Sequence, residues 1–148
     1  MSEKGDKAKN LFNSGFNCCQ SVVGAFCEDF GLDFDTTVKM VSPLGAGMGR
    51  MREVCGAVSG MFIVLGMKNG YNDPKAFDEK KEIYEKVQNL AKSFEDENGS
   101  IICRNLLGIN VKKDNPEPSK RTDEYYKKRP CGDIVKLAAE IVEKELLK

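Results

Sequence analysis

The residues best suited to chemistry in this 148-residue chain are its six cysteines: Cys18, Cys19, Cys27, Cys55, Cys103 and Cys131. A cysteine thiolate is both a nucleophile and a metal ligand. The chain contains no histidine, so the commonest general base and the commonest metal-ligating side chain are both missing. This composition excludes serine–histidine triads, cysteine–histidine nucleophile pairs, and histidine-ligated haem or zinc sites.

Thiolates without histidine can form three kinds of site. They can cycle between dithiol and disulfide, hold an iron–sulfur cluster, or hold a structural zinc ion with four sulfurs. Zinc sites and ferredoxin-type clusters usually take close cysteine pairs such as CxxC, and the chain has no CxxC motif. We therefore rank redox-active thiols and an iron–sulfur cluster nearly level, with zinc third.

The elements that must position these cysteines show helical periodicity, and no alternating strand pattern appears. Predicted helices cover roughly residues 8–12, 18–30, 36–41, 54–67, 74–98, 100–107 and 131–142. Asp35 is the expected N-cap of the helix at 36–41, and Ser100 that of the helix at 100–107. Residues 54–67 are apolar or small on nearly every side, but these 14 residues are too few to span a bilayer. We predict an all-α, single-domain helical bundle over residues 1–148, built around this buried central helix. Gly56 and Gly60 on one face of it would let another backbone approach closely.

Four of the cysteines fall at predicted helix starts. They are Cys18 after the N-cap residue Asn17, Cys55 after the glycine-rich turn at 45–49, Cys103 three residues after Ser100, and Cys131 directly after Pro130. A helix amino terminus presents unpaired N–H groups and the positive end of the macrodipole, which lower a cysteine pKa well below about 8.5. We therefore expect the four to gather at one site, as reactive thiols or as ligands of a bound cofactor or metal. Gaps of 37, 48 and 28 residues separate them, so only the fold could bring them together.

The other two cysteines fit ordinary core packing. Cys19 lies on the apolar face that Val22 and Phe26 share, and Cys27, in the middle of the same predicted helix, lies near that face. We expect Cys27 to lie apart from the site. We also expect Cys55 to react with alkylating reagents faster than Cys27 at about pH 6 to 7.

Two further segments near the cysteines have less specific patterns. The run from Gly45 to Arg50 lacks the strand and the Lys-Ser/Thr of a P-loop, so we expect its glycines to let backbone pass close to Cys55 rather than to bind a nucleotide. Arg50 and Arg52 would favour a thiolate at Cys55; the alternative is two exposed arginines on a turn. Residues 111–130 contain three prolines among alternating charges and are predicted as a loop without an assigned function.

Several short motifs together resemble the C_GCAxxG_C_C family of redox-active proteins. They are Asn17-Cys18-x-Gln20, the segment CGAVSG at 55–60, Cys103-x-x-Leu106-Leu107-Gly108, and Arg129-Pro130-Cys131. The resemblance runs from about Ala8 to the carboxyl terminus. It implies redox chemistry at Cys18, Cys55, Cys103 and Cys131, and it treats Cys19 and Cys27 as additions of this chain.

Charge and the amino-terminal sequence narrow the function further. Basic and acidic residues both number 23, so there is no basic excess to bind nucleic acid or an anionic membrane. Residues 1–10 lack the apolar stretch of a signal peptide, so we expect a cytoplasmic protein without membrane insertion. We expect it to exchange disulfides or electrons with an unidentified partner protein or small molecule, as an oxidoreductase if it turns over. The alternative is a non-catalytic accessory module whose cysteines hold an iron–sulfur cluster or zinc.

Overall fold

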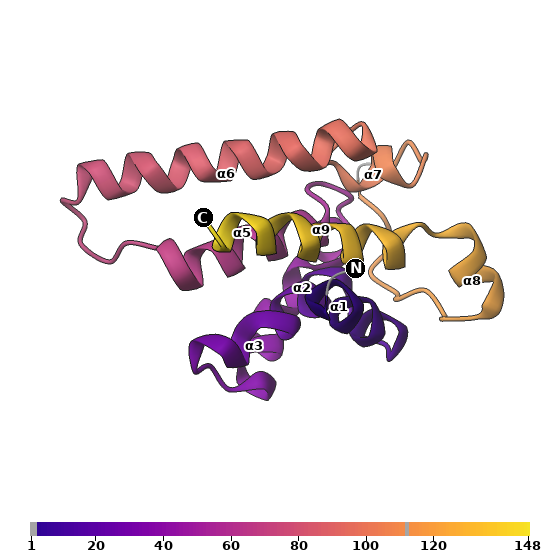
Figure 1. Cartoon of the computed structure of the whole chain (residues 1–148). Coiled ribbons are helices and arrows are strands. Elements are labelled where there is room, and N and C mark those ends of the chain that lie inside the picture. Colours follow the sequence, from indigo (N-terminus) through magenta and orange to yellow (C-terminus); the bar gives the residue numbers. More distant parts are fainter. Residues whose placement is uncertain (1–2, 112) are drawn as a thin grey trace.

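The computed structural model describes residues 3–111 and 113–148 and folds them into helices, with no strand among the described residues (Figure 1). In chain order the helices are α1 (Glu3–Asn13), α2 (Cys18–Phe26), α3 (Phe34–Val41), α4 (Gly45–Gly49), α5 (Gly56–Asn69), α6 (Phe77–Asn98), α7 (Cys103–Leu106), α8 (Asp123–Lys128) and α9 (Cys131–Leu146). Two short 3₁₀ turns are η1 (Cys27–Phe30) and η2 (Ser42–Leu44). The predicted all-α fold class is confirmed.

The buried central helix predicted at 54–67 is α5, displaced by two residues. Most of its residues from Gly56 to Leu65 are buried, because α5 packs against α2 on one side and α9 on another. The predicted close approach is present: a Cβ added at Gly60 would lie 2.8 Å from the Cβ of Val22, so only glycine lets α2 and α5 come this near. Helix α1 completes the core by packing on α2 and α9.

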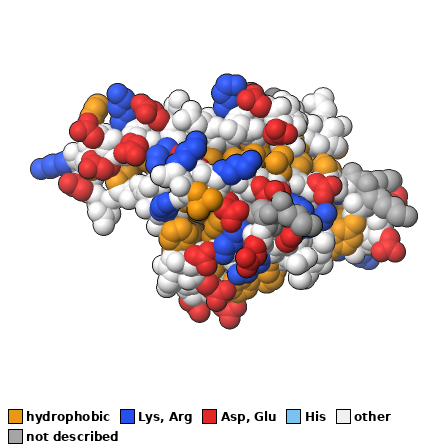
Figure 2. Space-filling view, in the orientation of Figure 1, with side chains coloured by type: hydrophobic (Ala, Val, Ile, Leu, Met, Phe, Trp, Pro, Cys, Tyr) orange, Lys and Arg blue, Asp and Glu red, His pale blue; other side chains and the backbone are white. Residues whose placement is uncertain are grey.

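The long helix α6 runs along the outside of this core, beside α5 and α9 (Figure 1). It buries Ile83, Leu90 and Phe94, and its outer face carries acidic and basic side chains interspersed with one another (Figure 2). Its charged outer face agrees with the amphipathic pattern of the sequence. No helix in the described part of the chain is long and apolar enough to cross a membrane.

Three local predictions were wrong for reasons of hydrogen bonding. Asp33, not Asp35, caps α3, because its carboxylate accepts the N–H of Thr36 at 2.8 Å. Ser100 does not cap α7; its hydroxyl accepts the N–H of Ile102 at 3.0 Å, before the helix begins. Cys27 is not in the middle of a helix but ends α2 and begins η1.

The segment predicted as a plain loop at 111–130 contains the short helix α8. The hydroxyl of Thr122 caps this helix by accepting the N–H of Tyr125 at 3.2 Å. Thr122 is followed by two acidic residues, Asp123 and Glu124, which favour a helix start. The three prolines of the segment flank α8 rather than interrupt it.

Candidate functional site

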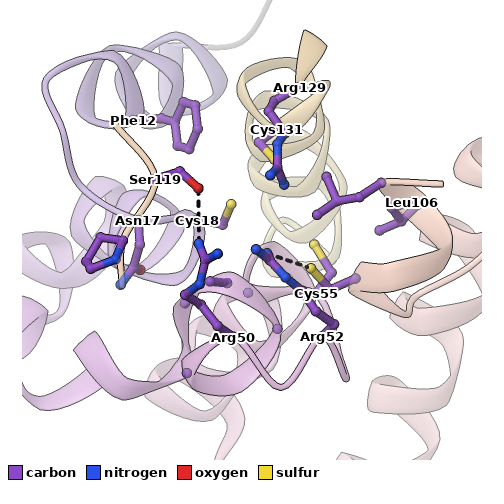
Figure 3. A pocket seen from close by; sticks show the side chains of 18 of the residues that line it. Phe12, Asn17, Cys18, Arg50, Arg52, Cys55, Leu106, Ser119, Arg129 and Cys131 are labelled. Carbon is purple, nitrogen blue, oxygen red and sulfur yellow. Dashed lines mark hydrogen bonds between the residues drawn. The ribbon is translucent and has the colours of Figure 1, made fainter. Parts of the chain in front are cut away.

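The four cysteines predicted at helix starts line one cavity of about 430 Å³ (Figure 3). Cys18 and Cys131 are partly exposed, whereas Cys55 and Cys103 are buried. The remaining two, Cys19 and Cys27, are fully buried and do not line the cavity. The structure thus separates the six cysteines into the two groups that the sequence predicted, and their chemical roles stay predictions.

A capping box places Cys18 at the first residue of α2. The side chain of Asn17 accepts the N–H of Gln20 at 2.9 Å, and the side chain of Gln20 accepts the N–H of Asn17 at 3.0 Å. The Asn17 amide also donates to the carbonyl of Ser42 at 3.0 Å. Gly45 is required beside it, because a Cβ at that position would overlap the Asn17 side chain.

Cys131 is the first residue of α9 and lies next to Cys18 in the cavity. Hydrogen bonding with Cys18 and the positive charges of Arg129, Arg121 and Arg52 lower the pKa of Cys131 to about 7 against the cost of burial. The same hydrogen bonding, burial and the Cys131 charge hold the pKa of Cys18 well above its usual range. At neutral pH a substantial fraction of Cys131 is therefore thiolate, whereas Cys18 keeps its proton.

Cys55 and Cys103 are brought together by backbone hydrogen bonds between their segments. The N–H of Cys55 donates to the carbonyl of Ile101 at 2.8 Å, and the N–H of Cys103 donates to the carbonyl of Glu53 at 2.6 Å. Between these bonds Val54 and Ile102 form an isolated antiparallel bridge. This short pairing links the starts of α5 and α7, a contact that helical periodicity in the sequence does not predict.

Burial decides the protonation of this second pair. Burial raises the pKa of Cys55 to about 12, although the backbone N–H groups of Ala57 and Val58 at the start of α5 oppose the shift. Burial also raises the pKa of Cys103, although Arg52 donates to its sulfur at 3.7 Å and favours the thiolate. The expectation that all four helix starts lower a cysteine pKa is therefore wrong for Cys18, Cys55 and Cys103. The prediction that Cys55 is alkylated faster than Cys27 loses its physical basis, because burial raises the pKa of both thiols.

Arg50 and Arg52 were predicted either to favour a thiolate at Cys55 or to lie exposed on a turn. The structure contradicts the exposed alternative, because the side chain of Arg52 is only 3% exposed and that of Arg50 only 15%. Both guanidinium groups pair with the carboxylate of Asp114, at 3.1 Å from Arg50 and 3.0 Å from Arg52. The hydrogen bond of Arg52 to a cysteine goes to the sulfur of Cys103, not to that of Cys55.

Comparison with known proteins identifies the family of this chain. A family model described as "Putative redox-active protein (C_GCAxxG_C_C)" matches residues 16–145, which is most of the chain. The chain belongs to the C_GCAxxG_C_C family. No curated protein and no solved structure matches it.

A left-handed turn is the part of this C_GCAxxG_C_C site that the sequence did not predict. The backbone of Ala46, Met48 and Arg50 has positive φ values of 56°, 66° and 67°, and the N–H of Arg50 donates to the carbonyl of Ala46 at 3.0 Å. The helix α4 is therefore left-handed, a conformation that costs a non-glycine residue about 1–2 kcal/mol. The alternate glycines of the segment are the only sequence signal for it, because Gly47 and Gly49 take positive φ without that cost.

Tertiary contacts hold this turn in place. A Cβ added at Gly47 would lie 2.6 Å from the Cβ of Cys103 and 2.7 Å from the Cα of Arg52, so the turn passes directly over the start of α7. The glycines were predicted to let backbone pass close to Cys55. In the structure, Gly47 lies close to Cys103 instead. The ion pairs of Arg50 and Arg52 with Asp114 then hold the far side of the turn.

Residues 114–122, a segment with no function predicted from the sequence, form a strap along one wall of the cavity. Arg50 donates to the carbonyl of Asn115 at 2.7 Å and to the hydroxyl of Ser119 at 3.1 Å (Figure 3). At the other end, Arg121 donates to the carbonyls of Phe12 and Phe16 at 3.0 and 3.1 Å. Nothing in the order of residues along the strap indicates these contacts, because their partners are distant in sequence.

The same cysteines were expected to hold an iron–sulfur cluster or zinc if a cofactor is bound. Among the described residues, no three histidine, cysteine, aspartate or glutamate side chains are arranged so that they could hold one metal ion. The donor set of four thiols suits zinc or an iron–sulfur cluster chemically. Its present arrangement does not, so binding either group would require the side chains to move.

Proposed function

We propose that the protein is a thiol-based oxidoreductase in which Cys131 is the nucleophile and Cys18 is its partner thiol. The observation that carries this proposal is the arrangement of the Cys18 and Cys131 side chains, which lie next to each other in one cavity at the starts of α2 and α9. It pairs a thiolate that is present at neutral pH with a protonated thiol within reach. That combination is what thiol–disulfide exchange requires.

The proposed reaction starts with attack of the Cys131 thiolate on one sulfur of a disulfide substrate. A bond forms between Cys131 and that sulfur, the substrate S–S bond breaks, and the other substrate sulfur leaves as a thiolate. The Cys18 thiol gives its proton to the leaving thiolate and attacks the Cys131 sulfur. The second substrate thiolate then leaves, so the substrate gains two electrons and the protein is left with a Cys18–Cys131 disulfide, which an external dithiol reduces again.

Cys55 and Cys103 complete the proposed four-cysteine site as protonated thiols. Arg52 is positioned to stabilise the Cys103 thiolate whenever that thiol loses its proton, since it already donates to the sulfur. A disulfide formed at Cys18 and Cys131 could pass to this second pair by a further exchange within the cavity. Cys55 and Cys103 would then be oxidised, Cys18 and Cys131 would be reduced again, and the disulfide would be held away from solvent.

The alternative function, a metal- or cluster-holding accessory module, is supported by one observation: the four sulfurs line a single cavity. Metal analysis and absorption spectra of anaerobically purified protein distinguish the two functions. Stoichiometric zinc without redox change, or a visible absorbance that bleaches on reduction, would favour the alternative.

Single-turnover kinetics with a small disulfide test the proposed function. Cys131→Ser should abolish the reaction, whereas Cys18→Ser should react once and stop as a mixed disulfide on Cys131, detected as added mass. Cys27→Ser is the matched control and should behave like the unmodified protein, because Cys27 does not line the cavity. Full reactivity of Cys131→Ser would overturn the proposal.

A further inference from the structure

The charge of the cavity wall is one-sided. Four arginines line the cavity, Arg50, Arg52, Arg121 and Arg129, and no aspartate or glutamate is among the lining residues. On the face of the molecule shown in Figure 2, by contrast, acidic and basic side chains are mixed. A cavity lined by one sign of charge concentrates ligands of the opposite sign.

Local carboxylates neutralise only part of this charge. Asp114 lies behind Arg50 and Arg52 and pairs with both, so one negative charge serves two positive ones. Within the part of the chain that the structure describes, no ion pair joins Arg121 or Arg129 to a carboxylate. Counting the Cys131 thiolate as a further negative charge, the cavity keeps an excess of two positive charges.

One of the side chains that carry this excess is aimed at the reacting sulfurs. Arg129 points into the same space as Cys18 and Cys131 (Figure 3). Its guanidinium lies 5.5 Å from the ring centre of Tyr125, and that of Arg121 lies 5.1 Å from the same ring. Tyr125 therefore holds both arginines at the cavity wall without neutralising them.

The size of the cavity matches a small molecule. Its volume of about 430 Å³ falls within the roughly 300–1,000 Å³ of ordinary small-molecule sites. The strap at 114–122 closes one wall through the contacts of Arg50 and Arg121. A small disulfide fits within this volume with the strap in place.

We infer that the substrate of this site is a small anionic disulfide, the oxidised form of a thiol that carries carboxylates. A carboxylate of the substrate would pair with Arg129, and Arg121 would add its positive charge, while one of the substrate sulfurs meets Cys131. This inference rests on the proposed thiol–disulfide function and names its substrate class. The exchange is the one described above, with two carboxylate-bearing thiols released for each Cys18–Cys131 disulfide formed.

Three small disulfides of similar size test the inference: dithiodipropionate, which carries two negative charges, bis(2-hydroxyethyl) disulfide, which carries none, and cystamine, which carries two positive charges. The rate of Cys18–Cys131 disulfide formation is measured with each at low ionic strength. Each rate is divided by the rate of the same disulfide with 2-mercaptoethanol, which removes intrinsic reactivity. We expect the anionic reagent to exceed the cationic one by roughly tenfold or more, because a positive cavity attracts it.

Two further measurements keep the inference falsifiable. Added salt should reduce the preference for the anionic reagent, because ions screen exposed charges. Arg129→Gln should lower the ratio of anionic to cationic rates by about threefold or more. A change in the pKa of Cys131 alone would alter all three rates together and leave this ratio unchanged, so the ratio separates substrate binding from an effect on the thiolate. Lys92→Gln removes an equal charge from the exposed face of α6 and should leave the ratio unchanged.

The outcomes distinguish the inference from the proposed function. If the Cys18–Cys131 disulfide forms but the normalised rates show no anionic preference, or Arg129→Gln leaves the ratio unaltered, the inference is overturned and the proposed function stands. If no disulfide reagent forms the Cys18–Cys131 bond, both are overturned.

Discussion

At the scale of single residues, the site shows that position at a helix start does not by itself set the pKa of a cysteine. Cys55 and Cys131 both stand at helix starts, yet the pKa of Cys55 is raised to about 12 by burial and that of Cys131 is lowered to about 7 by the Cys18 hydrogen bond and nearby arginines. For Cys131, hydrogen bonding with a neighbouring thiol and the charges of three arginines outweigh the effect of burial on the pKa. For Cys55, burial is the largest cause and decides the direction of the shift.

This difference predicts a pH profile for alkylation. In reduced, metal-free protein, the rate of Cys131 alkylation by iodoacetamide should rise through about pH 7 and then level off, because its pKa is lowered to about 7. Cys55 should stay slow over the same range, because its thiol remains protonated up to its pKa of about 12. Peptide mapping by mass spectrometry measures both rates in one sample.

Variants of Cys18 give the matched control for this profile. Cys18→Ala removes the donor, so the midpoint for Cys131 should move up toward the ordinary value of 9.0, whereas Cys18→Ser keeps a hydroxyl donor and should move it less. An unchanged midpoint in Cys18→Ala would show that the hydrogen bond does not control Cys131.

At the scale of elements, the left-handed α4 places Arg52 beside Cys103 and Gly47 against the start of α7. Gly47 and Gly49 have similar φ values of 67° and 64°, but only Gly47 lacks space for a side chain. Substitution at Gly49 costs backbone strain alone, whereas substitution at Gly47 adds a steric clash.

Gly47→Ala should therefore lower the free energy of unfolding by about 1–3 kcal/mol more than Gly49→Ala. Urea denaturation followed by circular dichroism measures both. Gly47→Ala should also change the alkylation rate of Cys103, whose Cβ the new methyl group would contact, more than that of Cys131. Equal destabilisation by the two variants would contradict the close packing described for this turn.

The capping box of α2 carries a second prediction at this scale. Asn17→Ala should lower the free energy of unfolding by about 1 kcal/mol, because it removes the N-cap of α2. It should also raise the pH midpoint of Cys131 alkylation, because the start of α2 no longer holds Cys18 in place. Asp33→Ala removes the cap of α3, outside the cavity, and should lower stability without moving that midpoint. A Cys131 midpoint unmoved in Asn17→Ala would mean that the cap does not position Cys18.

The elements also show which parts of the site the sequence could predict. Helix starts at Cys18 and Cys131 follow from local signals, a capping residue before one and proline before the other, so both were predicted within a residue. The left-handed turn and the buried Arg52 depend on contacts with Cys103 and Asp114, more than 50 residues away in sequence. Periodicity and capping rules read only near neighbours, so they gave no indication of either.

At the scale of the whole molecule, one core joins the elements that carry the site. Buried residues of α1, α2, α5 and α9 form a single hydrophobic cluster, and Cys55 belongs to it. We therefore expect one cooperative unfolding transition. Far-ultraviolet dichroism, dominated by helix, and the loss of cysteine protection should give coincident midpoints in urea. Two separated midpoints would contradict a single domain.

The proposed pairing of Cys18 with Cys131 is tested most directly by a disulfide map of the oxidised protein. Reduced, metal-free protein is treated with one equivalent of a small disulfide, the remaining thiols are blocked at low pH, and the peptides are identified by mass spectrometry. We expect loss of two thiols and a peptide pair joined through Cys18 and Cys131, or through Cys55 and Cys103 after internal transfer. Oxidation confined to Cys19 and Cys27, or no intramolecular disulfide at all, would contradict it.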